Sequence, residues 1–84
     1  MNERKMAEQI LYYAGGAENI VSMTTCTIRL RLVLKDAEKM DVEGIKKVEG
    51  ISDVIIRQGM HQLVIGLNAG KVLAEIKKLQ ETIS

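Results

Sequence analysis

The chain has 84 residues, enough for one domain but too few for two separate hydrophobic cores. Its 12 basic and 11 acidic residues give a formal net charge of +1, and it lacks the basic cluster and stacking aromatics typical of a nucleic-acid partner. Its single cysteine excludes an internal disulfide, and one cysteine with one histidine supplies too few ligands for a typical metal site. No apolar run approaches the roughly 20 residues that cross a bilayer. We therefore expect one domain over residues 1–84, in a reducing, cytoplasmic environment, with no metal and no cofactor.

A helix is predicted first, over residues 3–14. Its apolar residues recur at the three- and four-residue spacing of one helical face. Asn2 is a candidate N-cap, because its side chain can accept hydrogen bonds from the first free backbone N–H groups. Gly15 and Gly16 are expected to end the helix, since glycine adopts the left-handed cap conformation without strain.

Two strands are predicted next. Residues 20–23 are β-prone, and residues 29–34 alternate strictly between one leucine face and a second face carrying Arg29 and Arg31. Such alternation is typical of a half-buried strand. We expect a hairpin whose connection carries Cys26.

The second half of the chain repeats this order. Asp41 is a candidate N-cap for a short helix that stops at Gly50. Residues 52–57 and 60–66 are predicted strands, because the Gln58-Gly59 pair between them has the chemistry of a tight turn.

A last amphipathic helix is predicted to begin near Asn68. The resulting order is helix, two strands, helix, two strands, helix. We predict an α+β fold in which three helices cover one face of a four-stranded antiparallel sheet, because each strand has one apolar face to cover.

The residues with most chemical content surround Cys26. Hydroxyl side chains flank the thiol, and Arg29 and Arg31 follow on the polar face of the predicted strand. These two side chains leave the same face about 6.5–7 Å apart along the strand, and paired guanidinium groups are well suited to holding a phosphate. A thiolate is a good nucleophile. The plainer interpretations are a small buried cysteine and a solvated arginine face.

Several stretches form a pattern that continues through residues 5–80. They are Gly15-Gly16-x-Glu18-Asn19-Ile20, Cys26-x-x-Arg29-Leu30-Arg31-Leu32, Asp36, Lys46-Lys47-x-x-Gly50-Ile51 and Gln62-Leu63-Val64-Ile65-Gly66. Together they resemble the IIB domain of the glucose–sucrose family of bacterial sugar phosphotransferase systems.

This resemblance implies a phosphocarrier. Cys26 matches the nucleophile that takes a phosphoryl group from a phosphohistidine of the IIA protein or domain. The phosphocysteine then passes that group to a sugar bound by the membrane-embedded IIC domain, which would tether the chain to the cytoplasmic face of the membrane. Arg29 and Arg31 match the two arginines that hold the phosphoryl oxygens. No metal or organic cofactor is implied.

The chain departs from the family pattern at one position. The family usually has threonine directly before the first arginine, and this chain has Ile28 there, with Thr27 one place earlier. Thr25 and Thr27 are therefore expected to support the phosphate-binding loop, and Ile28 contributes only its backbone N–H. The departure leaves a second interpretation open, a regulatory or binding module that keeps the fold and the anion site without the transfer. A redox thiol protein is a weaker third, because no second cysteine is present.

Gln62, Asp36 and His61 are three further polar side chains of interest. Gln62 is expected to help order the side chains of the site or, more simply, to form a cross-strand hydrogen bond. Asp36 is expected to cap a turn after the strand. His61 could relay protons to Cys26, but an incidental surface position is the simpler expectation.

Overall fold

The computed structural model describes residues 2–83, so the end residues Met1 and Ser84 of the predicted domain lie outside the described residues. The elements follow the predicted order. They are α1 (Glu3–Tyr13), η1 (Ala17–Asn19), β1 (Ile20–Cys26), β2 (Arg29–Leu34), η2 (Ala37–Lys39), α2 (Val42–Lys46), β3 (Asp53–Arg57), β4 (Met60–Val64) and α3 (Ala69–Ile83). The sequence did not predict η1 and η2, because a single 3₁₀ turn is too short to show a hydrophobic period.

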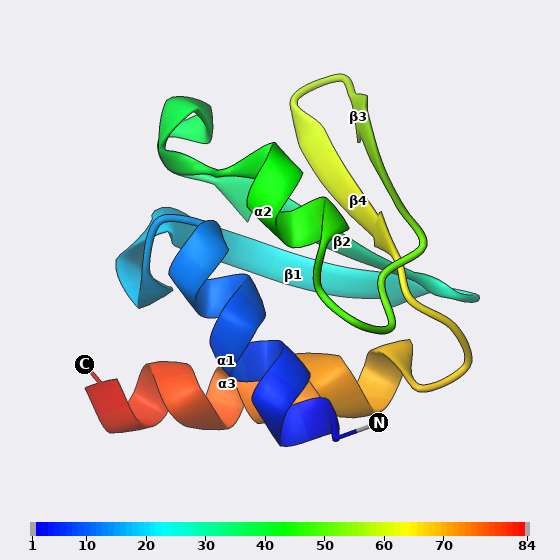
Figure 1. Ribbon diagram of the computed structural model, residues 1–84. Helices are drawn as coiled ribbons and strands as arrows, with labels where there is room; N and C mark the ends of the chain where they lie inside the picture. The colour runs from blue at the N-terminus through cyan, green and yellow to red at the C-terminus, as the bar shows by residue number, and fades with distance from the viewer. Residues whose placement is uncertain (1, 84) are drawn as a thin grey trace.

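The four strands form one antiparallel sheet in the order β1-β2-β4-β3. The helices pack on one face of this sheet, with α1 and α3 side by side (Figure 1). The predicted α+β architecture is confirmed. The two central strands are β2 and β4. The sequence analysis did not predict that these two strands pair with each other.

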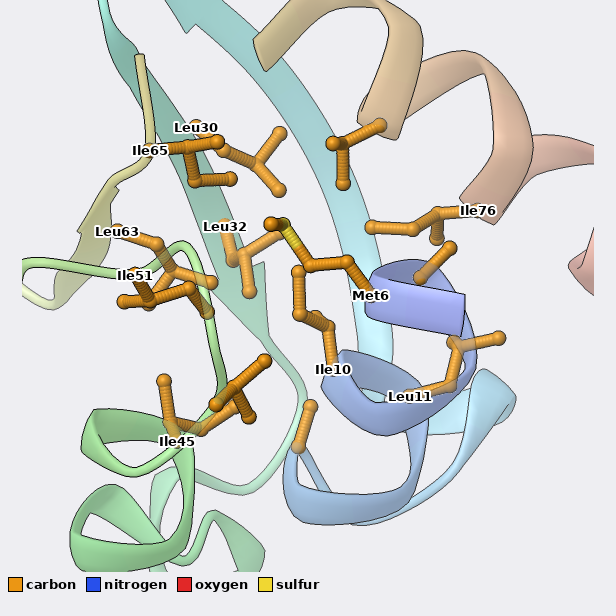
Figure 2. Packing of buried hydrophobic residues seen from close by; sticks show 14 of the residues in the cluster. Met6, Ile10, Leu11, Leu30, Leu32, Ile45, Ile51, Leu63, Ile65 and Ile76 are labelled. Carbon is orange, nitrogen blue, oxygen red and sulfur yellow. The ribbon is translucent and has the colours of Figure 1, made fainter. Parts of the chain in front are cut away.

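The core lies between the sheet and the helices. Leu30 and Leu32 of β2 and Leu63 of β4 are fully buried. Figure 2 shows them facing the helices, whose large side chains in the same cluster include Met6, Ile10, Leu11, Ile45 and Ile76. Burial of each large aliphatic side chain contributes about 1.5–3 kcal/mol, so this single cluster is the main source of stability.

Both predicted N-caps of the first two helices are confirmed. The Asn2 carboxamide oxygen accepts a hydrogen bond from the Arg4 backbone N–H at 2.9 Å, and Asp41 does the same for Gly44 at 2.9 Å. α2 is shorter than predicted, because it ends at Lys46 rather than near Gly50. α3 begins directly after Asn68, as expected.

Buried Asn19 ties together the end of the sheet that lies away from Cys26. Its amide nitrogen donates to the Ala14 carbonyl at 2.7 Å and to the Asp36 carbonyl at 2.9 Å, and its oxygen accepts from the Asp36 N–H at 2.8 Å. One side chain thus joins the end of α1, the start of β1 and the loop after β2. Asp36 in turn caps η2 through a hydrogen bond from Glu38, the role predicted for it.

Candidate functional site

The candidate site begins at the turn between β1 and β2. Cys26 is the last residue of β1, not part of the connection as predicted, and it pairs directly with Arg29. The connection is only Thr27 and Ile28, with Thr27 at a φ of 56°. A threonine at positive φ is uncommon. Hydrogen bonds from another part of the chain stabilise this turn. The Ile28 carbonyl accepts hydrogen bonds from the N–H groups of Ile65 and Gly66, both at 2.9 Å, in the segment leading to α3 (Figure 1).

The register of the sheet decides which side chains share a face. Directly paired residues lie on the same side of an antiparallel sheet, so Cys26 lies with Arg29, and Thr24 lies with Arg31. This is the face opposite the buried leucines, which no helix covers (Figure 1). Thr25 pairs with a buried leucine and points to the other face. Thr25 was expected to support the phosphate-binding loop, but Thr24, and not Thr25, lies on the face of the thiol.

The thiol of Cys26 is exposed and free. Its Sγ atom lies 4.0 Å from the Thr27 hydroxyl oxygen, within a weak sulfur hydrogen bond. Exposure contradicts the plainer interpretation of a small buried apolar cysteine. The thiol can therefore be approached by another molecule.

The two arginines lie half-buried on β2, between β1 and β4. The Arg29 Nη1 group donates a hydrogen bond of 3.1 Å to the side-chain oxygen of Gln62 on β4. Gln62 is only 7% exposed although no helix covers its face. The Nε group of Arg31 is buried and has no hydrogen-bond partner within the described residues.

Beside the arginines the face is hollowed by a shallow depression of about 290 Å³. Its lining residues are Arg29, Arg31, Arg57, Gln58, Met60 and Gln62. Arg57 was missed by the sequence analysis, because β3 joins this face only through its pairing with β4. The signal was the two-residue Gln58-Gly59 turn, which pairs Arg57 with Met60 and fixes the register of both strands.

His61 was expected at the surface, and that expectation is wrong. It is 4% exposed, pairs with Leu32, and so lies on the helix-covered face of the sheet. Burial lowers its pKa from the ordinary value of 6.5, and its Nδ1 atom has no hydrogen-bond partner within residues 2–83. The sheet separates its ring from the thiol, so a direct proton relay to Cys26 is excluded.

In the described part of the chain, no helix has both the length and the apolar character to cross a membrane. Among residues 2–83, no group of three His, Cys, Asp or Glu side chains gathers in a way that could hold a metal ion.

Comparisons with known proteins agree on one family. Residues 8–41 match the family model described as phosphotransferase system, EIIB. The chain is 34% identical over 80 residues to a probable sucrose-specific EIIBC component of the phosphotransferase system (PTS) from Bacillus subtilis. It is 40% identical over 75 residues to a trehalose-specific EIIBC component from the same organism. These alignments cover 94% and 88% of the chain, but only 17% and 16% of the two relatives.

A solved structure gives the same result at the level of the fold. The crystal structure of one domain of the PTS system IIabc component from Clostridium difficile aligns with a TM-score of 0.82 and 32% sequence identity. The alignment covers 90% of this chain and 80% of that one. The helix-free face described above therefore lies on a fold that matches this domain over most of both chains.

Proposed function

This chain belongs to the EIIB family of the phosphotransferase system, of the glucose–sucrose type, and on that premise we propose that it is a phosphocarrier in sugar uptake whose acceptor is Cys26. The supporting observation is the exposed thiol, paired directly with Arg29 on the face that no helix covers. Phosphoryl transfer needs an accessible nucleophile and positive charge near the phosphoryl oxygens. This corner of the sheet offers both.

In the first proposed step, the Cys26 thiolate attacks the phosphorus of a phosphohistidine on a IIA protein or domain. An S–P bond forms, the P–N bond breaks, and its electron pair stays with the imidazole nitrogen. In the second step, a sugar hydroxyl oxygen attacks the same phosphorus. The S–P bond then breaks, the thiolate is regenerated, and the hydroxyl proton is released to water.

The arginines are proposed to hold the phosphoryl oxygens during both steps. The backbone of Arg29 pairs with that of Cys26, and the hydrogen bond from Arg29 to Gln62 restricts where the guanidinium group can lie. Arg31 is the next residue of the same face, with Thr24 opposite it. Thr27 and the Ile28 N–H are proposed to support the turn that carries the phosphoryl group. Groups fixed in advance in this way stabilise the charge that develops during transfer.

The proposed partners come from the same family assignment. The relatives named above are EIIBC components, and we infer that this chain also works with a IIC domain and with a IIA donor. Sugar specificity then lies with IIC. We propose that the chain acts in the cytoplasm, or at the cytoplasmic face of the membrane when tethered to IIC.

The test is labelling with radioactive phosphoenolpyruvate, the general phosphotransferase proteins and a matching IIA. The parent should be labelled and Cys26→Ser should not. Ser22→Ala should be labelled like the parent, because Ser22 lies on the same strand and face but away from the thiol. Equal labelling of Cys26→Ser and the parent would remove Cys26 as the acceptor.

Ile28 favours a second candidate, a regulatory or binding module with an anion site but no transfer. Intact-mass measurement after incubation with phosphorylated IIA separates the two functions. A phosphoryl mass located at Cys26 supports the carrier. A complex with phosphorylated IIA but no added mass on this chain supports the module.

A further inference from the structure

A third guanidinium group lines the depression on the helix-free face. Arg57 is the last residue of β3 and is exposed, and it pairs with Met60 across the β3–β4 ladder. Register places Met60 with Val33 and Gln62 with Arg31 on the same face. The long side chain of Arg57 therefore approaches the depression from the side opposite to Arg29 and Arg31, and Gln62 forms part of the floor.

The charge of this depression is unbalanced. None of its six lining residues is acidic, and none of its three arginines forms an ion pair among residues 2–83. The acidic side chain in β3 on this face is Asp53, at the far end of the strand, where it accepts a hydrogen bond from the Val54 N–H. Three guanidinium groups gathered without a carboxylate repel one another, and a bound anion would relieve that repulsion.

The donors around the depression also suit a tetrahedral oxyanion. The buried Nε group of Arg31 has no partner in the described structure, and Gln58 and Gln62 add side-chain amides. Arginine holds phosphate through paired N–H groups in a fixed plane. The volume of about 290 Å³ is close to the lower end of small-ligand pockets, which begin at about 300 Å³.

The depression is distinct from the thiol. Cys26 and Arg57 lie on the two edge strands, with β2 and β4 between them. Three strand spacings separate them by about 14 Å across the sheet. Cys26 is not among the lining residues, and Arg57 cannot serve a phosphoryl group at Cys26 while it reaches into the depression.

We propose that Arg57, together with Arg29 and Arg31, forms a non-covalent binding site for a dianionic phosphate group at the centre of the helix-free face. The ligand is inorganic phosphate or the phosphate of a monoester such as a sugar phosphate. Binding does not require a phosphoryl group on Cys26, so the site and the proposed carrier function can fail separately.

The experiment follows amide chemical shifts of the isotopically labelled Cys26→Ser variant during titration with inorganic phosphate, at constant ionic strength. Shifts should centre on Arg57, Gln58 and Met60. Adding Arg57→Gln should weaken binding about tenfold, the effect of losing one hydrogen bond to a charged group. Arg4→Gln is the matched control, because it removes the same charge from α1 on the helical side, and it should change the Kd less than about twofold.

A parallel titration with glucose 6-phosphate separates the two sources of the phosphate group. Equal Kd values assign the site to the phosphate group alone, and a clearly tighter sugar phosphate assigns it to phosphate monoesters. Equal effects of Arg57→Gln and Arg4→Gln would overturn the proposal, because they would report general charge attraction. Shifts confined to the turn at positions 26–28, or no binding by either probe, would overturn it as well.

Discussion

The two faces of the sheet are built from the same strands and differ in almost every property. On β2, Leu30 and Leu32 are fully buried under the helices, while Arg29 and Arg31 lie half-buried on the face without helices. Neighbouring residues of β2 therefore lie on different faces, one in the core and the next in the candidate site, because successive side chains of a strand point to opposite faces. Core residues and residues of the candidate site therefore alternate along β2, so substitutions should separate effects on stability from effects on the proposed transfer.

The largest expected effect is on the helix-covered face. Leu32→Ala should lower the free energy of unfolding by about 2–5 kcal/mol, because it opens a cavity in a core with no solvent access. Urea unfolding followed by circular dichroism measures this. Val33→Ala, the next residue of the same strand, should cost much less, since Val33 is only partly buried on the other face. Equal losses of unfolding free energy for the two variants would contradict the contrast between the two faces of the sheet.

The next effect is on the helix-free face. Arg31→Gln should slow phosphorylation of Cys26 about 10²–10³-fold, the range for removing one preorganised donor to developing charge. Its free energy of unfolding should change far less than that of Leu32→Ala. The measurement is the initial rate of label transfer from phosphorylated IIA. Arg4→Gln should keep the parent rate, and a similar slowing there would point to a loss of overall positive charge instead.

A smaller effect is expected at the end of the sheet away from the thiol. Asn19→Ala removes three hydrogen bonds from one buried side chain and leaves the Ala14 carbonyl and both backbone groups of Asp36 without this partner. A loss of about 1–3 kcal/mol in unfolding free energy is expected. The phosphorylation rate of the folded variant should stay near that of the parent. A large loss of rate without a loss of stability would show that the two ends of the sheet are coupled.

The smallest effect concerns pH and the single histidine. The pKa of His61 is lowered in the folded state by burial, so the unfolded chain binds the proton more readily. Stability from this group is complete above the ordinary pKa of 6.5 and declines as the pH falls below it. Thermal unfolding at about pH 7.5 and about pH 5.5 measures the decline. His61→Gln should reduce it, and an unchanged decline in that variant would assign it to other groups.

The residues at the turn illustrate how far sequence reasoning reached. Alternation correctly placed Arg29 and Arg31 together on the polar face, because that pattern is local to one strand. The sequence analysis predicted Cys26 in a loop, because the threonines around it show no clear hydrophobic period. In the structure, β1 extends through these threonines and ends at Cys26. His61 was taken for a surface residue, because its burial comes from packing by helices distant in the sequence.

By itself, the sequence determined the order of elements, the two N-caps at Asn2 and Asp41, the leucine face of β2 and the Cys-x-x-Arg-Leu-Arg stretch that resembles one family. These are properties of neighbouring residues, set by helical and strand periods and by side-chain chemistry. Only the tertiary structure decided that β4 lies beside β2, that Gln62 bonds to Arg29, and that Arg57 joins the same face. Such contacts depend on which strands pair and in which register, and that is settled by burying the whole core at once.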